Sequence, residues 1–505
     1  MSGRGPHIVK MCRVIPSRCR GPLVLPLAMA FALLAPVAEG QTSTESERRR
    51  IEAVTAPTTG FTAAEAFEQL PGGAATVSGD LGREAFSRPS ANMSFERELD
   101  FHLGQALFDK LWVASPASTK ASDGLGPLYN ARSCQACHIR DGRGQVSGRP
   151  GLVLRVGRVR DDGVLPDPLF GLQIQDSAVP GLRPEARVAV SYTETEVALI
   201  GGEVALIGGE VAVLRKPRYR LDAAQGELHS QSALSPRLAP QMIGLGLLEA
   251  IPEAEILAYA DPDDRDGDGI SGRPNRVADL ETGQEALGRF GWKAGAATVL
   301  DQSAAAFASD IGISSPLLPA PWGDCTALQV ECRNAPHGNG DLRGTEIDGP
   351  ALALTAFYSR NLAVPARRDV DDPDVLRGKR VFYSIGCPAC HVPKHVTARL
   401  SDRPEQSFQL IWPYTDLLLH DMGDGLADGL PHGVATGREW RTAPLWGIGL
   451  TEQVSGEARF LHDGRARTLL EAVLWHGGEA AAQRDRVIDL TPEDRAALIR
   501  FLESL

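Results

Sequence analysis

Two cysteine pairs, each followed at once by a histidine, carry the clearest chemistry in this chain. The residues are Cys134, Cys137 and His138 in the first copy, and Cys387, Cys390 and His391 in the second. In a Cys-x-x-Cys-His motif the two thiols add to the vinyl groups of a haem, and the imidazole becomes the proximal ligand of its iron. The two intervening residues let both sulfurs reach the porphyrin edge from one turn of chain. The motifs therefore predict two covalently attached haems.

The same cysteines allow a second interpretation, a single zinc site. Two Cys-x-x-Cys pairs can supply the four thiolates of a tetrahedral zinc ion. Such a site has no use for a histidine directly after both pairs, however, and these pairs lie far apart in the chain. The histidines favour the haems over the zinc site.

The N-terminus has the pattern of an export signal. The apolar run from Pro22 to Ala38 follows a basic segment, and Ala38-Glu39-Gly40 is a small-residue cleavage site. Three prolines interrupt the run, which is short for a membrane span, so residues 1–40 are expected to be cleaved and to leave no stable membrane span. We therefore expect the protein in the periplasm, the oxidising compartment where such haems are attached.

The charge balance narrows the choice of partners. The formal net charge is −12, and without the five basic residues and the one acidic residue of positions 1–40 it becomes about −16. An acidic exported protein favours a basic partner or a small neutral substrate and argues against nucleic acid. Outside residues 1–40 and the two motifs, the chain has Cys325 and Cys332, which lie in a short stretch rich in turn residues. In an oxidising compartment they predict a disulfide, with two free thiols as the alternative.

The domain organisation follows from changes in composition. Residues 41–94 read as a flexible or loosely docked arm, and residues 95–370 and 371–505 as two haem domains. Within the first domain, residues of about 151–222 have the alternating pattern of strands, and there the heptapeptide EVALIGG (196–202) is repeated at once (203–209). We interpret the repeat as a duplication that lengthens a hairpin. The expected fold class is mainly α, with two cytochrome c-like domains and a small β-rich insertion in the first.

An acidic turn is a candidate calcium site. Asp264, Asp266 and Asp268 place carboxylates on alternate residues, and Gly269 follows at the sharp turn. The twelfth position of a calcium loop would be Asn275 in place of a bidentate glutamate, so this is not an EF-hand. A structural calcium ion and a solvated acidic turn both remain open.

Several segments around the two motifs make the chain resemble a known family. The segments are LGQALF (103–108), NARSCQACHIRDGRG (130–144), SPRLAPQMIGLGLLEAI (235–251), DGDGISGRPN (266–275), LGRFGWKAG (287–295), PYTDLLLHDMGDGLAD (413–428), EWRTAPLWGIGL (439–450) and FLHDGRARTLLEAVLWHGGEA (460–480). In this order they resemble the di-haem oxidoreductase family of peroxidases, which is related to bacterial di-haem cytochrome c peroxidases and MauG. The resemblance covers residues 95–505.

The resemblance implies a sixth ligand for the second haem. In the family a ligand lies fourteen residues after the histidine of a His-Asp-Gly segment, and here His462 leads to His476. Peroxidases usually have methionine there and MauG has tyrosine, so this chain departs from both. Imidazole is a competent axial ligand that favours ferric iron and lowers the reduction potential. Met422 and His420 are the competing candidates.

The resemblance also implies a peroxide site at the first haem. The family has a tryptophan between the haems, a glutamine ten residues later and an acid beyond it, which correspond to Trp292, Gln302 and Asp310. Asp310 lies two residues early, which puts its role in doubt. An acid with an amide beside it can relay the proton that peroxide cleavage requires. Resting peroxidases often hold a distal histidine upstream of a Pro-Arg segment, and His229 is the candidate for it.

The expected function is therefore that of a di-haem peroxidase. It would receive electrons from a small redox protein, such as a cytochrome c, at the C-terminal haem, and would reduce hydrogen peroxide or another small substrate at the N-terminal haem. The alternatives are a two-haem electron carrier without peroxidase activity and MauG-like oxidation of another substrate.

Overall fold

The computed structural model describes residues 44–146, 151–161, 163–197, 212–223, 225–339 and 344–505. All of them belong to one compact unit that begins at Ser43. The predicted signal at residues 1–40 lies outside the described residues, as does most of the EVALIGG repeat. Within the described ranges, no helix has both the length and the apolar character that crossing a membrane requires.

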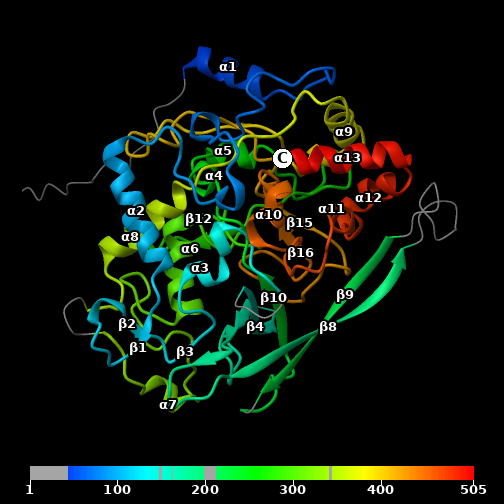
Figure 1. The fold of residues 1–505 in the computed structure, drawn as a ribbon. Coiled ribbons are helices and arrows are strands. Elements are labelled where there is room, and N and C mark those ends of the chain that lie inside the picture. The colour runs from blue at the N-terminus through cyan, green and yellow to red at the C-terminus, as the bar shows by residue number, and fades with distance from the viewer. Residues whose placement is uncertain (1–43, 147–150, 162, 198–211, 224, 340–343) are drawn as a thin grey trace, which may run out of the picture. The chain divides into compact units, whose positions relative to one another are not determined.

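Short and medium helices joined by long loops make up much of the fold (Figure 1). The α-helices are α1 (Glu45–Thr55), α2 (Phe95–Asp109), α3 (Cys134–Cys137), α4 (Leu245–Glu249), α5 (Glu253–Leu257), α6 (Val299–Ala306), α7 (Val330–Arg333), α8 (Gly349–Arg360), α9 (Pro373–Ser384), α10 (Thr451–Ser455), α11 (Leu469–Leu474), α12 (Ala481–Ile488) and α13 (Pro492–Ser504). The π-helical turn η5 (Phe307–Ile311) continues α6, and the 3₁₀ turn η6 (Cys387–Ala389) follows α9.

Helices α9 and α13 form the frame of the C-terminal part. Gly378 is buried in α9, where a Cβ atom would lie 1.9 Å from the carbonyl oxygen of Ala497 in α13. The missing side chain therefore allows the two helices to cross in backbone contact. Thr491 begins α13, because its hydroxyl oxygen accepts a hydrogen bond from the amide of Asp494 and Pro492 occupies the first turn.

The strands are grouped in small sheets. They are β1 (Val113–Ala114), β2 (Asp123–Leu125), β3 (Leu128–Tyr129), β4 (Leu152–Arg160), β5 (Gly163–Leu165), β6 (Gln173–Ile174), β7 (Ser177–Ala178), β8 (Ala186–Val197), β9 (Ala212–Ala223), β10 (Ser232–Leu238), β11 (Arg276–Ala278), β12 (Glu285–Leu287), β13 (His395–Val396), β14 (Leu410–Ile411), β15 (Leu419–Asp421) and β16 (Glu439–Arg441). Strand β4 pairs with β10, β5 and β6, whereas β8 and β9 pair only with each other among the described strands. This hairpin keeps an unbroken register from Ala186–Ala223 to Val197–Ala212.

The expected mainly α fold class was wrong. The structure is 31% helix and 19% strand, so neither type dominates, and its many small sheets do not confirm two cytochrome c-like domains. The physical reason lies in the insertion, where β4, β8 and β9 are longer than the pattern of residues 151–222 suggested, and in β10, which lies beyond those residues and was not predicted. Elsewhere, loops rich in glycine and proline form short paired strands, which leave little signal in the sequence.

The hairpin β8–β9 links the insertion to the C-terminal part of the chain. Leu214 on β9 packs in one apolar cluster with Leu474 on α11. The Tyr219 hydroxyl reaches the Asp463 carboxylate at 3.4 Å, and the Arg215 side chain donates to the carbonyl oxygen of Arg465 at 2.8 Å. The hairpin therefore contacts the segment that runs from Asp463 to α11.

The predicted arm is packed into the body of the fold. Ala75, Ala85 and Phe86 are almost fully buried in the largest apolar cluster. Glu68 is also buried and accepts hydrogen bonds from Arg367 and Lys379. The expectation of a flexible arm rested on small and polar residues, which here fill close contacts and bind buried basic side chains.

Candidate functional site

Both Cys-x-x-Cys-His motifs open onto one cavity. Its volume is about 520 Å³, and its walls include His138 and His391. His476 also lies in the wall, together with Trp292, Gln302 and Asp310. The structure thus brings most of the predicted site residues to a single space.

The first motif is held by its own short helix and by a backbone carbonyl. Ser133 accepts a hydrogen bond from the amide of Ala136 and so begins α3. The Nδ1 atom of His138 lies 2.8 Å from the Pro240 oxygen. Because a carbonyl oxygen can only accept, Nδ1 carries the proton and the lone pair of Nε2 is left for another partner. Burial lowers the pKa of His138, which favours this neutral form.

The second motif repeats the arrangement. The Nδ1 atom of His391 lies 3.0 Å from the Tyr414 oxygen, so its Nε2 is likewise left without a proton. Burial, followed by the proximity of His476, lowers the pKa of His391 to about 4. Burial also raises the pKa values of Cys134 and Cys387 to about 12, and all four motif cysteines are free thiols.

The candidates for the sixth ligand of the second haem differ in whether an atom with a lone pair is left to bind a metal. His476 donates from Nδ1 to the Ala472 oxygen at 2.8 Å, and it lies close enough to His391 to affect its protonation. His420 has both ring nitrogens 2.8 Å from carboxylates, one of Asp416 and one of Glu479, so it offers no lone pair to a metal. Met422 lines the cavity and remains a competitor.

Asp310 is fixed by neighbours on two sides. Its Oδ1 atom accepts a hydrogen bond from the Gln173 amide at 2.8 Å, and its main-chain oxygen accepts from the amides of Asn130 and Ala131. These contacts hold the π-helical turn η5 against the chain that enters the first motif. The negative charge of Asp310 also reaches His138, where it opposes the effect of burial on the pKa.

His229, the predicted distal histidine, lies elsewhere. It is not among the described residues that line the cavity. Its amide donates to Asp167, and its Nδ1 accepts from the amide of Gln231 at 3.2 Å. The local turn of the β-rich insertion therefore holds this side chain.

An aromatic cluster crosses the space between the two motifs. Trp292 donates from its indole nitrogen to the Leu238 oxygen at 2.7 Å and packs in one cluster with Trp440 and Trp475. Trp475 directly precedes His476. The imidazole of His462 stacks on Trp440, with 3.7 Å between ring centres and 13° between planes. The cluster thus extends from the predicted interhaem tryptophan to the residue beside the predicted sixth ligand.

A buried ion pair supports this cluster. The ammonium group of Lys293 lies 3.0 Å from Asp428 and 4.4 Å from the ring centre of Trp440, and both charged side chains are at most 1% exposed. Burial lowers the pKa of Lys293 to about 8, and the adjacent Asp428 opposes this shift.

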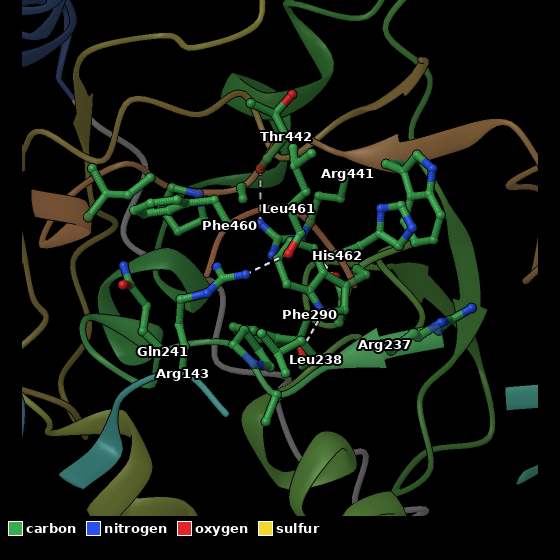
Figure 2. A pocket seen from close by; sticks show the side chains of 18 of the residues that line it. Arg143, Arg237, Leu238, Gln241, Phe290, Arg441, Thr442, Phe460, Leu461 and His462 are labelled. Carbon is green, nitrogen blue, oxygen red and sulfur yellow. Dashed lines mark hydrogen bonds between the residues drawn. The ribbon is translucent and has the colours of Figure 1, made fainter. Parts of the chain in front are cut away.

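Four arginines of the cavity wall lack carboxylate partners among the described residues, and one of them, Arg155, has the Ser309 hydroxyl at 3.5 Å. Arg143 donates to the Leu461 oxygen at 2.6 Å, as Figure 2 shows, and Arg441 donates to the oxygens of Gly291 and Thr442. Within the described ranges, neither these two nor Arg237 forms a salt bridge. Burial lowers the pKa values of Arg143, Arg237 and Arg441 to about 10.

Buried positive charge of this kind, satisfied only by neutral oxygens, favours an anionic partner. A haem brings two carboxylates on its propionate groups, so the arginines, the paired thiols and the two free imidazole lone pairs together fit bound haem. Sequence reasoning missed Arg143, Arg237, Arg441 and Lys293, although all four lie inside the motif segments. The presence of charged residues within these apolar segments was the signal that could have identified them.

Two other predicted features lie apart from the cavity. Cys325 and Cys332 form a disulfide whose Cα atoms are 6.1 Å apart. The exposed carboxylates of Asp264, Asp266 and Asp268 each offer an oxygen, and these oxygens lie within 4.8 Å of one another. Exposed acidic groups gather in this way with and without a cation, so calcium stays a prediction.

The family described as "Di-haem oxidoreductase, putative peroxidase" matches residues 67–166 and 173–505. No curated protein matches. Among solved structures, hydrazine synthase from Kuenenia stuttgartiensis is 18% identical with a TM-score of 0.23, and the match covers 32% of this chain and 57% of that one.

Proposed function

Because the chain belongs to the di-haem oxidoreductase family, we propose that it is a peroxidase that binds two haems covalently, one at each motif. The supporting observation is the single cavity onto which both motifs open, each with a buried histidine that keeps Nε2 free. Bound haem would supply iron that exchanges single electrons and offers a position for peroxide. An exported protein fits this proposal, since the first 40 residues have the pattern of a cleaved signal.

The residues of the chain would divide the work of binding. Cys134 and Cys137 would hold one haem, with His138 as its proximal ligand, and Cys387 and Cys390 the other. His391 and His476 would both bind the iron of that second haem. Arg143, Arg237 and Arg441 would bind propionate carboxylates, for which guanidinium groups are suited by geometry and charge.

The aromatic cluster suggests the direction of electron flow. A small redox protein, such as a cytochrome c, would deliver electrons at the His476 side. From there the cluster of Trp475, Trp440 and Trp292 leads toward the His138 side, where the open position would be. Gln302 and Asp310 lie in the cavity wall, and the fixed carboxylate of Asp310 would take up protons for the water that peroxide reduction forms.

The test of the proposed function combines haem counting with spectroscopy. The purified protein is expected to keep two haems after acid extraction, one high-spin and one low-spin, and its mixed-valence form is expected to react with hydrogen peroxide. The Cys387→Ala/Cys390→Ala variant should keep only the high-spin haem, whereas Cys325→Ser/Cys332→Ser, the matched control, should keep both. Two low-spin haems and no reaction with peroxide would favour the electron carrier.

A second prediction concerns His476. The His476→Met variant should keep its haem, because attachment depends on Cys387 and Cys390, and should show a higher midpoint potential, because a thioether favours ferrous iron. Redox titration followed at the low-spin bands measures this change. The control Met422→Leu should leave the potential and spectrum as they are. If Met422→Leu changes both and His476→Met changes neither, Met422 is the ligand.

A further inference from the structure

One cavity residue outside the predicted set is His432, on the loop between β15 and β16. Its amide donates to the Ala435 oxygen at 2.9 Å, and the Ala435 amide donates back to the His432 oxygen at 3.1 Å. Asn275, itself fully buried, donates from its side chain to the His432 oxygen at 2.9 Å and accepts from the amide of Val434. Four hydrogen bonds therefore fix the backbone from which the imidazole projects.

The imidazole lies directly against Gly295. A Cβ atom at Gly295 would be 2.0 Å from Cε1 of His432, so only glycine leaves room for the ring in this place. Gly295 belongs to the turn that leads from Trp292 into α6, the helix that carries Gln302. The ring of His432 thus lines the cavity beside the elements of the predicted peroxide site.

The ring nitrogens of His432 differ from those of the three predicted iron ligands. His138, His391 and His476 each donate from Nδ1 to a backbone carbonyl, whereas neither nitrogen of His432 has a hydrogen-bond partner among the described residues. His462 also lines the cavity without a ring hydrogen bond, but its ring is stacked on Trp440 and its Nε2 lies 3.8 Å from Asp463. A histidine in a fixed loop that faces a cavity with both nitrogens free is able to bind a small molecule there, and to exchange a proton with it.

The charges around His432 keep it neutral. Burial, and after it the nearby cations Arg237, Arg155 and Lys293, lower its pKa to about 3. Lys293 is paired with Asp428, and Arg155 has the hydroxyl of Ser309 at 3.5 Å. The imidazole is therefore neutral, with a nitrogen lone pair available, throughout the neutral pH range, and the adjacent cations favour an anion formed by loss of a proton.

The position of His432 in the cavity is nearer to the elements of the first haem motif. Arg237 lies on β10, which runs on through Leu238 to Pro240, and the Pro240 oxygen holds His138. Arg155 lies on β4, paired with β10, and its guanidinium reaches Ser309 beside Asp310. His432 therefore shares its end of the cavity with the elements that position His138 and Asp310.

We propose that His432 is a further catalytic residue, which transfers a proton between the two oxygens of hydrogen peroxide on the His138 side of the cavity. This proposal rests on the proposed function. His432 would accept the proton of one peroxide oxygen and return it to the other as the bond between them breaks and water leaves. Overall, hydrogen peroxide takes up two electrons from the one-electron donor protein and two protons from solvent, and two waters form.

Asp310 and His432 would then have separate tasks. The Oδ1 atom of Asp310 is already bound by Gln173, and its main chain is bound to the segment before the first motif, which suits a fixed entry point for solvent protons. His432 has no such partner and would act on the bound oxygens. Cyanide binding distinguishes the task of His432 from that of Asp310, because hydrogen cyanide must lose its proton to a nearby base as it binds ferric haem.

The experiment uses the loaded protein and measures cyanide association with the ferric high-spin haem by stopped flow at pH 7. The His432→Gln variant is expected to bind cyanide about a hundredfold more slowly and to react with peroxide about a hundredfold to ten-thousandfold more slowly, with an unchanged resting spectrum. His229→Gln, the matched control, should change neither rate. Gly295→Ala should slow cyanide association as well, because the new Cβ displaces the ring.

Each other outcome has a definite meaning. An unchanged cyanide rate in His432→Gln overturns the proposal. A parent haem that is low-spin and becomes high-spin in His432→Gln also overturns it, since His432 would then be an axial ligand. If the parent does not react with peroxide while His432→Gln still slows cyanide binding, the peroxidase function fails and the role of His432 as a base at this haem stands.

Discussion

Asp310→Asn is expected to slow peroxide turnover by about a hundredfold to ten-thousandfold, the range over which proton transfer by a positioned side chain contributes. The substitution keeps the size of the side chain and its hydrogen bond with Gln173, but an amide cannot take up and release protons. The absorption spectra of both haems, the potential of the second haem and the cyanide association rate should remain those of the parent. Steady-state kinetics with a small artificial reductant measures the effect.

The control for this prediction lies on the adjoining helix. Asp301 is buried near the start of α6 and accepts a hydrogen bond from the amide of Leu280, but it does not line the cavity. Asp301→Asn should therefore leave turnover near the parent rate. Parent-like turnover in Asp310→Asn would place the proton source elsewhere, and a slower cyanide rate in that variant would contradict the division of tasks with His432.

Lys293→Met is expected to lower the free energy of unfolding by about 3–5 kcal/mol, because it leaves the buried carboxylate of Asp428 without its cation. The double variant Lys293→Met/Asp428→Leu should recover most of this loss, since no isolated charge remains. Urea denaturation followed by circular dichroism measures both. The exposed pair Arg265–Asp263 supplies the control, and Arg265→Met should change the stability by less than about 0.5 kcal/mol. Equal losses for Lys293→Met and the double variant would mean that packing against Trp440, and not charge, is what the lysine provides.

Local patterns in the sequence were sufficient to identify much of the site. The spacing within each motif, the fourteen-residue step from His462 to His476 and the segment around Trp292 all led to residues that line one cavity. Each of these signals depends either on residues close together in the sequence or on the order of segments that the family shares.

Features that depend on distant contacts were not predicted. His432 became a candidate only when Gly295 and Asn275, far away in the sequence, were seen to hold it in place. His229 fitted a family offset but is held by Asp167 in a local turn. The burial of Phe86 in the predicted arm likewise depends on segments that follow it by hundreds of residues. Composition cannot report such contacts.

The hairpin β8–β9 bears on how the protein is made. Its strands are synthesised long before α11, yet Leu214 and Tyr219 contact α11 and the segment that leads into it. Until that part of the chain has been synthesised these side chains lack their partners, and contacts of such high sequence separation form late. The hairpin therefore completes its packing only after the second motif and α11 have been made.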